Sequence, residues 1–201
     1  MSFFNLFKKQ KETELFAHFL RKFPPGKQIS NISAEQLANY NHRLPQELQD
    51  FLLQHGEREL ADGLLTIINP KDYQGTLNAW LGQDTLDRIP LFKTAFGDLI
   101  YYRHLDDTTS DIALLDIHYR QTPVLAYQWQ DFFSQLALED QFTTDLLKQP
   151  LYQEAVKSLG PLAPNECYFF TPALVFGGSE QADYLDKGDL LVHHHILQNA
   201  V

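Results

Sequence analysis

Apolar residues recur at helical spacing in several separate stretches of the chain, with polar or helix-breaking residues between them. The first stretch, from about Gln10 to Lys22, places Leu and Phe side chains three and four residues apart. It stops at Pro24-Pro25-Gly26, because proline lacks the amide hydrogen that a helix interior requires. The spacing therefore predicts an amphipathic helix that ends before residue 24.

Capping signals predict further helices along the chain. Ser33-Ala34-Glu35-Gln36 has the form of a capping box, which opens a short helix to about Tyr40. Pro45 suits the first helical position, and Gly56 the C-terminal cap, of the next helix. Three more helices are predicted to run from Asn69-Pro70 to Gly82, around Trp129 to Leu136, and from about Asp189 to Asn199. Residues 146–159 also read as helical, with an interruption at Pro150.

Runs of branched and aromatic residues predict strands between these helices. The stretch from Ile89 to Arg103 holds two such runs, and Gly97-Asp98 between them can close a two-residue hairpin turn. Shorter apolar runs predict strands at residues 64–68, 112–119 and 168–176, while the polar run Glu57-Arg58-Glu59 and residues 104–110 are assigned to loops. Helices flanking a small, mainly antiparallel central sheet with a Gly-Asp hairpin predict an α+β fold.

The distribution of charge narrows the range of partners. The net charge is −10, yet the first 43 residues hold seven Lys and Arg against three Asp and Glu, so the remaining chain is strongly acidic. An acidic body repels nucleic acid, whose phosphates require cations, whereas it attracts a basic protein. The alternative is that the acidity only keeps the protein in solution.

Cysteine content and hydropathy indicate a cytoplasmic protein with no membrane partner. Cys167 is the only cysteine, so no internal disulfide can form, as suits a reducing compartment. Lys8-Lys9 follows the apolar start of the chain instead of preceding it, which is the wrong order for a secretory signal. No apolar run approaches the roughly 20 residues of a membrane-spanning helix.

No arrangement of residues predicts catalysis, a metal site or a cofactor. Neighbours on a helix point about 100° apart, so His193-His194-His195 cannot all reach one ion, and a structural role is expected for them. Cys167 lies among aromatic residues and is expected to pack in the core. The remaining histidines share no ligand spacing: His18, His42, His55, His104 and His118.

Acidic residues instead form three groups that could contact a partner. One group brackets a predicted turn, a second crowds the loop after the hairpin, and a third precedes the last helix. The candidate partner-binding residues are Glu57, Glu59, Asp62, Asp106, Asp107, Asp111, Asp183 and Asp186. The alternative for each of them is an ordinary solvated surface.

Four phrases in one order carry a family resemblance: the run from Leu44 to Phe51 with Gly56, the run from Asp62 to Tyr73, the run from Thr94 to Tyr102, and the run from Gly160 to Gly178. In these phrases the chain resembles the family that joins a GAD-like N-terminal region to a C-terminal domain long catalogued as a domain of unknown function. The resemblance implies two regions, 1–110 and 111–201, packed as one unit.

Some members of that family act as immunity proteins against DNase toxins of the type VI secretion system. The resemblance therefore implies a non-enzymatic protein that binds a cognate toxin and covers its active site or its DNA path. The sequence leaves the oligomeric state open. A more distant likeness to SMI1/KNR4-type proteins keeps a general interaction scaffold as an alternative, and a small metal-dependent enzyme is a third one.

Overall fold

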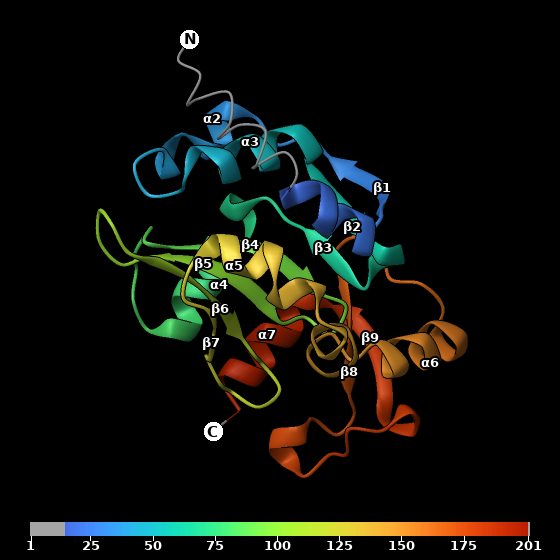
Figure 1. Cartoon of the computed structure of the whole chain (residues 1–201). Helices are drawn as coiled ribbons and strands as arrows, with labels where there is room; N and C mark the ends of the chain where they lie inside the picture. The colour runs from blue at the N-terminus through green and yellow to red at the C-terminus, as the bar shows by residue number, and fades with distance from the viewer. Residues whose placement is uncertain (1–14, 201) are drawn as a thin grey trace.

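A seven-stranded antiparallel sheet runs through the centre of the computed structural model, which describes residues 15–200 (Figure 1). The strands follow one another across the sheet in chain order, so each strand pairs with its neighbour in sequence. They are β1 (Pro25–Ser30), β2 (Glu57–Leu60), β3 (Leu65–Ile67), β4 (Arg88–Thr94), β5 (Leu99–His104), β6 (Ser110–Leu115) and β7 (Val124–Ala126). A separate two-stranded ribbon pairs β8 (Glu166–Phe170) with β9 (Leu185–Asp189).

The helices lie on both faces of the sheet (Figure 1). Residues 15–22 are helical, and the part of the predicted first helix before residue 15 lies outside the described residues. The later helices are α2 (Ala34–Leu37), α3 (Gln46–His55), α4 (Pro70–Leu81), α5 (Trp129–Ser134), α6 (Gln149–Leu159) and α7 (Leu190–Gln198). In the described part of the chain, none of them combines the length and apolarity that a bilayer span requires.

The hydrophobic core consists of two clusters, one on each face of the sheet, because side chains alternate between the faces along each strand. On β5, Ile100 and Tyr102 face the larger cluster, whereas Leu99 and Tyr101 face the smaller one, because successive side chains point to opposite faces. The larger cluster is rich in phenylalanine from the first helix, α3 and α5. The smaller cluster is filled by α4 and α7 and includes Tyr73, Leu77, Leu190, Leu197 and Cys167.

Most of the predicted helix ends are confirmed. The Ser33 hydroxyl accepts from Gln36 N–H while the Gln36 side chain accepts from Ser33 N–H, which completes the capping box. Asn69 caps α4, which ends at Gly82 in the left-handed region. The Asp189 carboxylate accepts the Val192 N–H at the start of α7, as the sequence predicts for the terminal helix.

The hairpin of residues 89–103 is confirmed, but its loop is longer than predicted. Thr94 accepts from Gly97 N–H and donates its own N–H to the Asp98 carbonyl, so the loop is Ala95-Phe96-Gly97. Gly97 has φ of +88°, which is the left-handed position that follows a type I turn in a three-residue hairpin loop. Asp98 was predicted to be the second residue of the turn, but it follows the loop and is buried.

Several strands were missed or misplaced because their sequences are polar or short. The predicted loop Glu57-Arg58-Glu59 belongs to β2, and β1 and β9 also lack an apolar pattern. The predicted strand 168–176 is correct only to Phe170, since a 3₁₀ turn occupies Leu174–Phe176. Pro150 lies in the first turn of α6 instead of interrupting it. The α+β class is confirmed, with a larger sheet than expected, while the division at residue 110 stays a prediction.

Candidate functional site

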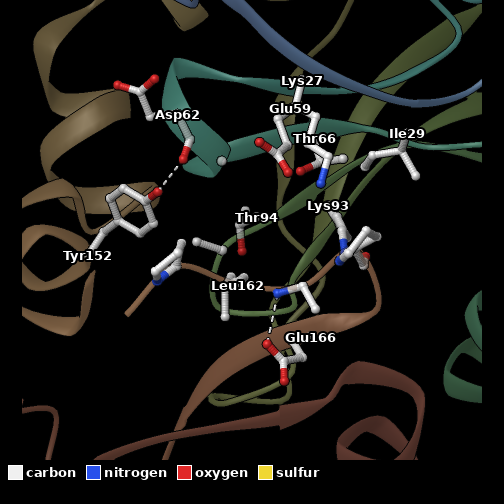
Figure 2. Close-up of a pocket in the computed structure, with 15 residues that line it drawn as sticks. Lys27, Ile29, Glu59, Asp62, Thr66, Lys93, Thr94, Tyr152, Leu162 and Glu166 are labelled. Carbon is white, nitrogen blue, oxygen red and sulfur yellow. Dashed lines mark hydrogen bonds between the residues drawn. The ribbon is translucent and has the colours of Figure 1, made fainter. Parts of the chain in front are cut away.

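A pocket of about 250 Å³ lies where the first four strands meet α6 and the loop of residues 160–166 (Figure 2). Its strand side carries Lys27, Glu59, Thr66 and Lys93, and the loop with Leu162 and Glu166 lies across from them. Tyr152 of α6 closes one end, where its hydroxyl donates to the Asp62 carbonyl at 2.5 Å. The pocket is therefore built by segments that are far apart in the sequence.

Sheet register explains the row of polar side chains on the strand side. Glu59 pairs with Thr66 across β2 and β3, and Thr66 pairs with Lys93 across β3 and β4. Directly paired residues point to the same face of a sheet, so these three side chains form one line. Helices α4 and α7 cover that face farther along, while the loop 160–166 covers it here.

Lys93 is the most unusual member of this row, because it is 95% buried. Its ammonium donates to the carbonyl of Pro164, and no ion pair of Lys93 is found among residues 15–200. Burial lowers the pKa of this amine from its ordinary value. A buried cation is normally matched by an anion, so this arrangement leaves an ammonium group that can take a further acceptor.

Side chains from outside the loop 160–166 hold it by donating hydrogen bonds to its backbone carbonyls. Lys187 donates to Pro161 O at 2.8 Å and Tyr168 donates to Gly160 O at 2.6 Å, in addition to the bond from Lys93 to Pro164. The Glu166 carboxylate accepts the Ala163 N–H at 2.8 Å across the same loop (Figure 2). These bonds fix a proline-containing segment that has no regular structure of its own.

The predicted partner-binding acids do not gather in one place. Glu59 and Asp62 lie at the pocket, while Asp106 and Asp107 border a different groove beside His42 and Arg43. Asp183 lies in the 3₁₀ turn before β9 and Asp186 lies on β9, and both are exposed to solvent. The acids are therefore spread over three parts of the molecule, and their role in binding stays a proposal.

Two of the predicted acids have internal partners. Glu57 is half-buried, accepts the Ser30 hydroxyl at 3.0 Å, and has its pKa raised by burial. Asp111 lies on β6 instead of in the loop, is buried, and binds Arg103 through both oxygens, with Nε to Oδ1 at 2.6 Å. The Asp111 carboxylate supports the sheet and offers little surface to a partner.

Two histidines hold the hairpin loop from opposite directions. His118 Nε2 donates to Phe96 O at 2.8 Å and His194 Nε2 donates to Gly97 O at 2.7 Å, since a carbonyl can only accept. His193 stacks on Phe169 with ring centroids 4.4 Å apart. Sequence spacing could not place His118 beside these residues of the terminal helix.

These buried rings are neutral. Burial lowers the pKa of His193 to about 3 and that of His194 to about 4, and it also lowers the pKa of His118. Within residues 15–200 no group of three or more His, Cys, Asp or Glu side chains has the geometry of a metal site. The arrangement accordingly fits the structural role predicted for His193 and His194.

Cys167 packs in the core, as predicted. It is fully buried beside the hairpin loop, and burial raises the pKa of its thiol to about 12. A thiol in this environment stays protonated, whereas a nucleophilic cysteine needs the thiolate.

Comparisons with known proteins divide the chain into two matched segments. A model of the GAD-like domain matches residues 14–116, and a model described as T6SS immunity protein Tdi1, C-terminal, matches residues 126–199. The fold is similar to the crystal structure of Atu4351 from Agrobacterium tumefaciens, with a TM-score of 0.68 and 17% identity over 90% of this chain and 87% of that chain. No match was found among curated proteins. The pocket lies between the two matched segments, since its strands belong to the first and its loop to the second.

Proposed function

Because the chain belongs to the GAD-like family of type VI secretion immunity proteins, we propose that it binds and neutralises a cognate toxin. The observation that carries this proposal is the match of residues 126–199 to the immunity-protein model. The toxin that we propose is a DNase, and the site of action is the cytoplasm, where such a toxin reaches DNA. Neutralisation by binding needs no turnover by this chain.

The charge of the molecule supports a DNase as the target. A DNase requires a basic surface to bind phosphates, and the chain has a net charge of −10. An acidic protein is attracted to the same surface and competes with DNA for it. We therefore propose that the chain covers the active site or the DNA path of the toxin.

The exposed acids are the proposed contacts for this competition. Asp106 accepts the N–H groups of Thr108 and Thr109 at 2.8 Å each, which fixes its loop and lowers the pKa of its carboxyl. Asp62, Asp107, Asp183 and Asp186 are also exposed, and the half-buried Glu59 lines the pocket. We leave Asp111 out of the proposed contacts because Arg103 already binds both oxygens of its carboxylate.

Co-expression tests the proposal directly. We expect the gene beside that of this chain to encode a nuclease effector, the chain to restore growth to cells that express this effector, and the purified pair to form a stable complex without DNase activity. Heat-denatured chain serves as the control in the DNA-cleavage assay. Continued cleavage at equimolar native chain would overturn the proposal.

A further inference from the structure

We propose that the pocket between the strands and the loop 160–166 binds a small molecule that carries both a carboxylate and an ammonium group, of the size of an amino acid. The inference is independent of toxin binding. It starts from the position of Lys93, which is buried at the strand side of the pocket and has one hydrogen-bond acceptor, Pro164 O, among the described residues.

The inner part of the pocket favours a carboxylate. An ammonium group has three donors, so Lys93 can give hydrogen bonds to a ligand without releasing Pro164. Thr66 is its neighbour across the strands and is also buried, with a hydroxyl that can donate. A carboxylate placed here would give the buried lysine a directly hydrogen-bonded anion, which Glu57, Glu59 and Asp189 do not supply because none of them forms an ion pair with it.

The mouth of the pocket favours a positive group. Glu59 lines the pocket and forms no ion pair within residues 15–200, whereas the Asp62 carboxylate points away from the pocket (Figure 2). The Glu59 carboxylate can bind the ammonium group of a ligand whose carboxylate lies on Lys93, and the exposed Lys27 beside it leaves the lining with charges of both signs. The third acid, Glu166, is already engaged by Ala163 N–H and by Lys187 at 3.7 Å.

The size and walls set the remaining limits. A volume of about 250 Å³ suits a molecule with the dimensions of an amino acid. Ile29, Leu162 and Pro161 supply apolar surface for its side chain. Because the loop is tied by Lys93, Lys187 and Tyr168, the pocket is formed before a ligand arrives.

Calorimetry on the full chain tests the proposal with the standard L-amino acids, followed by the N-acetyl derivative and the methyl ester of the best one. We expect the zwitterion to bind with a Kd below about 10 mM and both derivatives to bind at least about tenfold more weakly. Absence of binding by every amino acid would overturn the proposal. Equal binding by either derivative would overturn it as well.

Variants locate the site. Thr66→Val keeps the shape and removes the hydroxyl, so we expect about tenfold weaker binding, and Lys93→Met should abolish it. Lys71→Met, at an exposed lysine on α4 outside the pocket, is the matched control. Unchanged binding by folded Lys93→Met would refute the assignment.

A measurement on the unmutated chain covers the case in which Lys93→Met fails to fold. Lysine side chains labelled with ¹³C at Cε report the ionisation of each amine. We expect the best amino acid to raise the pKa of Lys93 and to leave the Cε signal of Lys71 where it is. A Lys93 signal that does not respond to saturating ligand would overturn the proposal.

Discussion

At the scale of single residues, most of the buried charged and titratable side chains discussed above are either paired or kept neutral. Arg103 donates two hydrogen bonds to the Asp111 carboxylate, and burial keeps the histidines neutral. Lys93 differs because it forms no ion pair within residues 15–200, although Glu57, Glu59 and Asp189 act on it from a longer distance. The sequence offered a signal for this residue, since it is a lysine inside the apolar run from Ile89 to Thr94, but the pattern alone could not tell a buried lysine from an exposed one.

Replacing Asp111 with Ala should destabilise the protein by about 2 kcal/mol. The change leaves Arg103 without its partner, and the cost is below that of a fully buried pair because the Arg103 side chain is 25% exposed. Urea denaturation measures the difference. The double variant Arg103→Met with Asp111→Leu should recover part of the loss, and a double variant as unstable as the single one would contradict this explanation.

The buried histidines should make the protein less stable in mild acid. Their pKa values are lowered in the folded state, so below pH 6.5 the unfolded chain binds more protons and stability falls as pH decreases. Asp98 and Glu57 act in the opposite direction, because burial raises the pKa of both, that of Asp98 to about 7, and the folded state then binds the extra proton. Burial also lowers the pKa of His55, and these four histidines outweigh the two carboxyls, so the net effect is a loss of stability between pH 6.5 and 4.5.

His193→Phe isolates one of these contributions. The Nε2 atom of His193 is buried without a partner among residues 15–200, so the change removes a titrating group and no hydrogen bond of this atom within that range. We expect the dependence of unfolding free energy on pH to become shallower by up to about 1.4 kcal/mol per pH unit. The exposed His195 changed to Gln is the control, and an equal effect in both variants would rule out burial as the cause.

At the scale of elements, the helices were predicted well because their ends are marked by local chemistry. Asn69, Gly82 and Asp189 each act on backbone groups within four residues, so the signal is contained in a short sequence. Strands β1, β2 and β9 carry no such mark. Their side chains are mostly half-buried or exposed, and pairing with a neighbouring strand, not hydrophobic alternation, holds them in place.

Replacing Gly97 in the hairpin loop should destabilise the protein far more than replacing Gly82, which also has a positive φ. A Cβ at Gly97 would lie 3.1 Å from Ile117 and 3.2 Å from Cys167, besides requiring positive φ. Gly97→Ala should therefore cost about 2–4 kcal/mol in unfolding free energy. Gly82→Ala has positive φ but no neighbour within 4 Å and should cost about 1 kcal/mol. Similar losses in thermal or urea denaturation would show that the packing argument is wrong.

At the scale of the whole molecule, the pocket could not be predicted from the sequence because its walls come from distant segments of the chain. Glu59 and Asp62 were singled out for their charge, yet nothing near them in sequence points to Lys93 or to the loop 160–166. The sheet register and the tied loop bring these residues together. The acidity of the body, by contrast, can be read from the sequence and leads to a prediction about association.

Neutralising exposed acids should slow toxin binding without weakening the complex once it has formed. For Asp106→Asn with Asp107→Asn, and for Asp183→Asn with Asp186→Asn, we expect association about three- to tenfold slower at low salt. Surface plasmon resonance at two salt concentrations measures both rates. Glu139→Gln with Glu154→Gln removes the same charge at other exposed positions, and an equal loss there would contradict a specific role for the candidate acids.

The order of the strands has one more consequence. Because every strand of the large sheet lies beside the one that precedes it in the chain, the longest span that any pairing closes is the one between Ser30 and Glu57, which limits the loss of chain entropy. The ladder can grow one strand at a time as the polypeptide leaves the ribosome. Such stepwise assembly lets the first strands of the sheet pair before the rest of the chain has been synthesised.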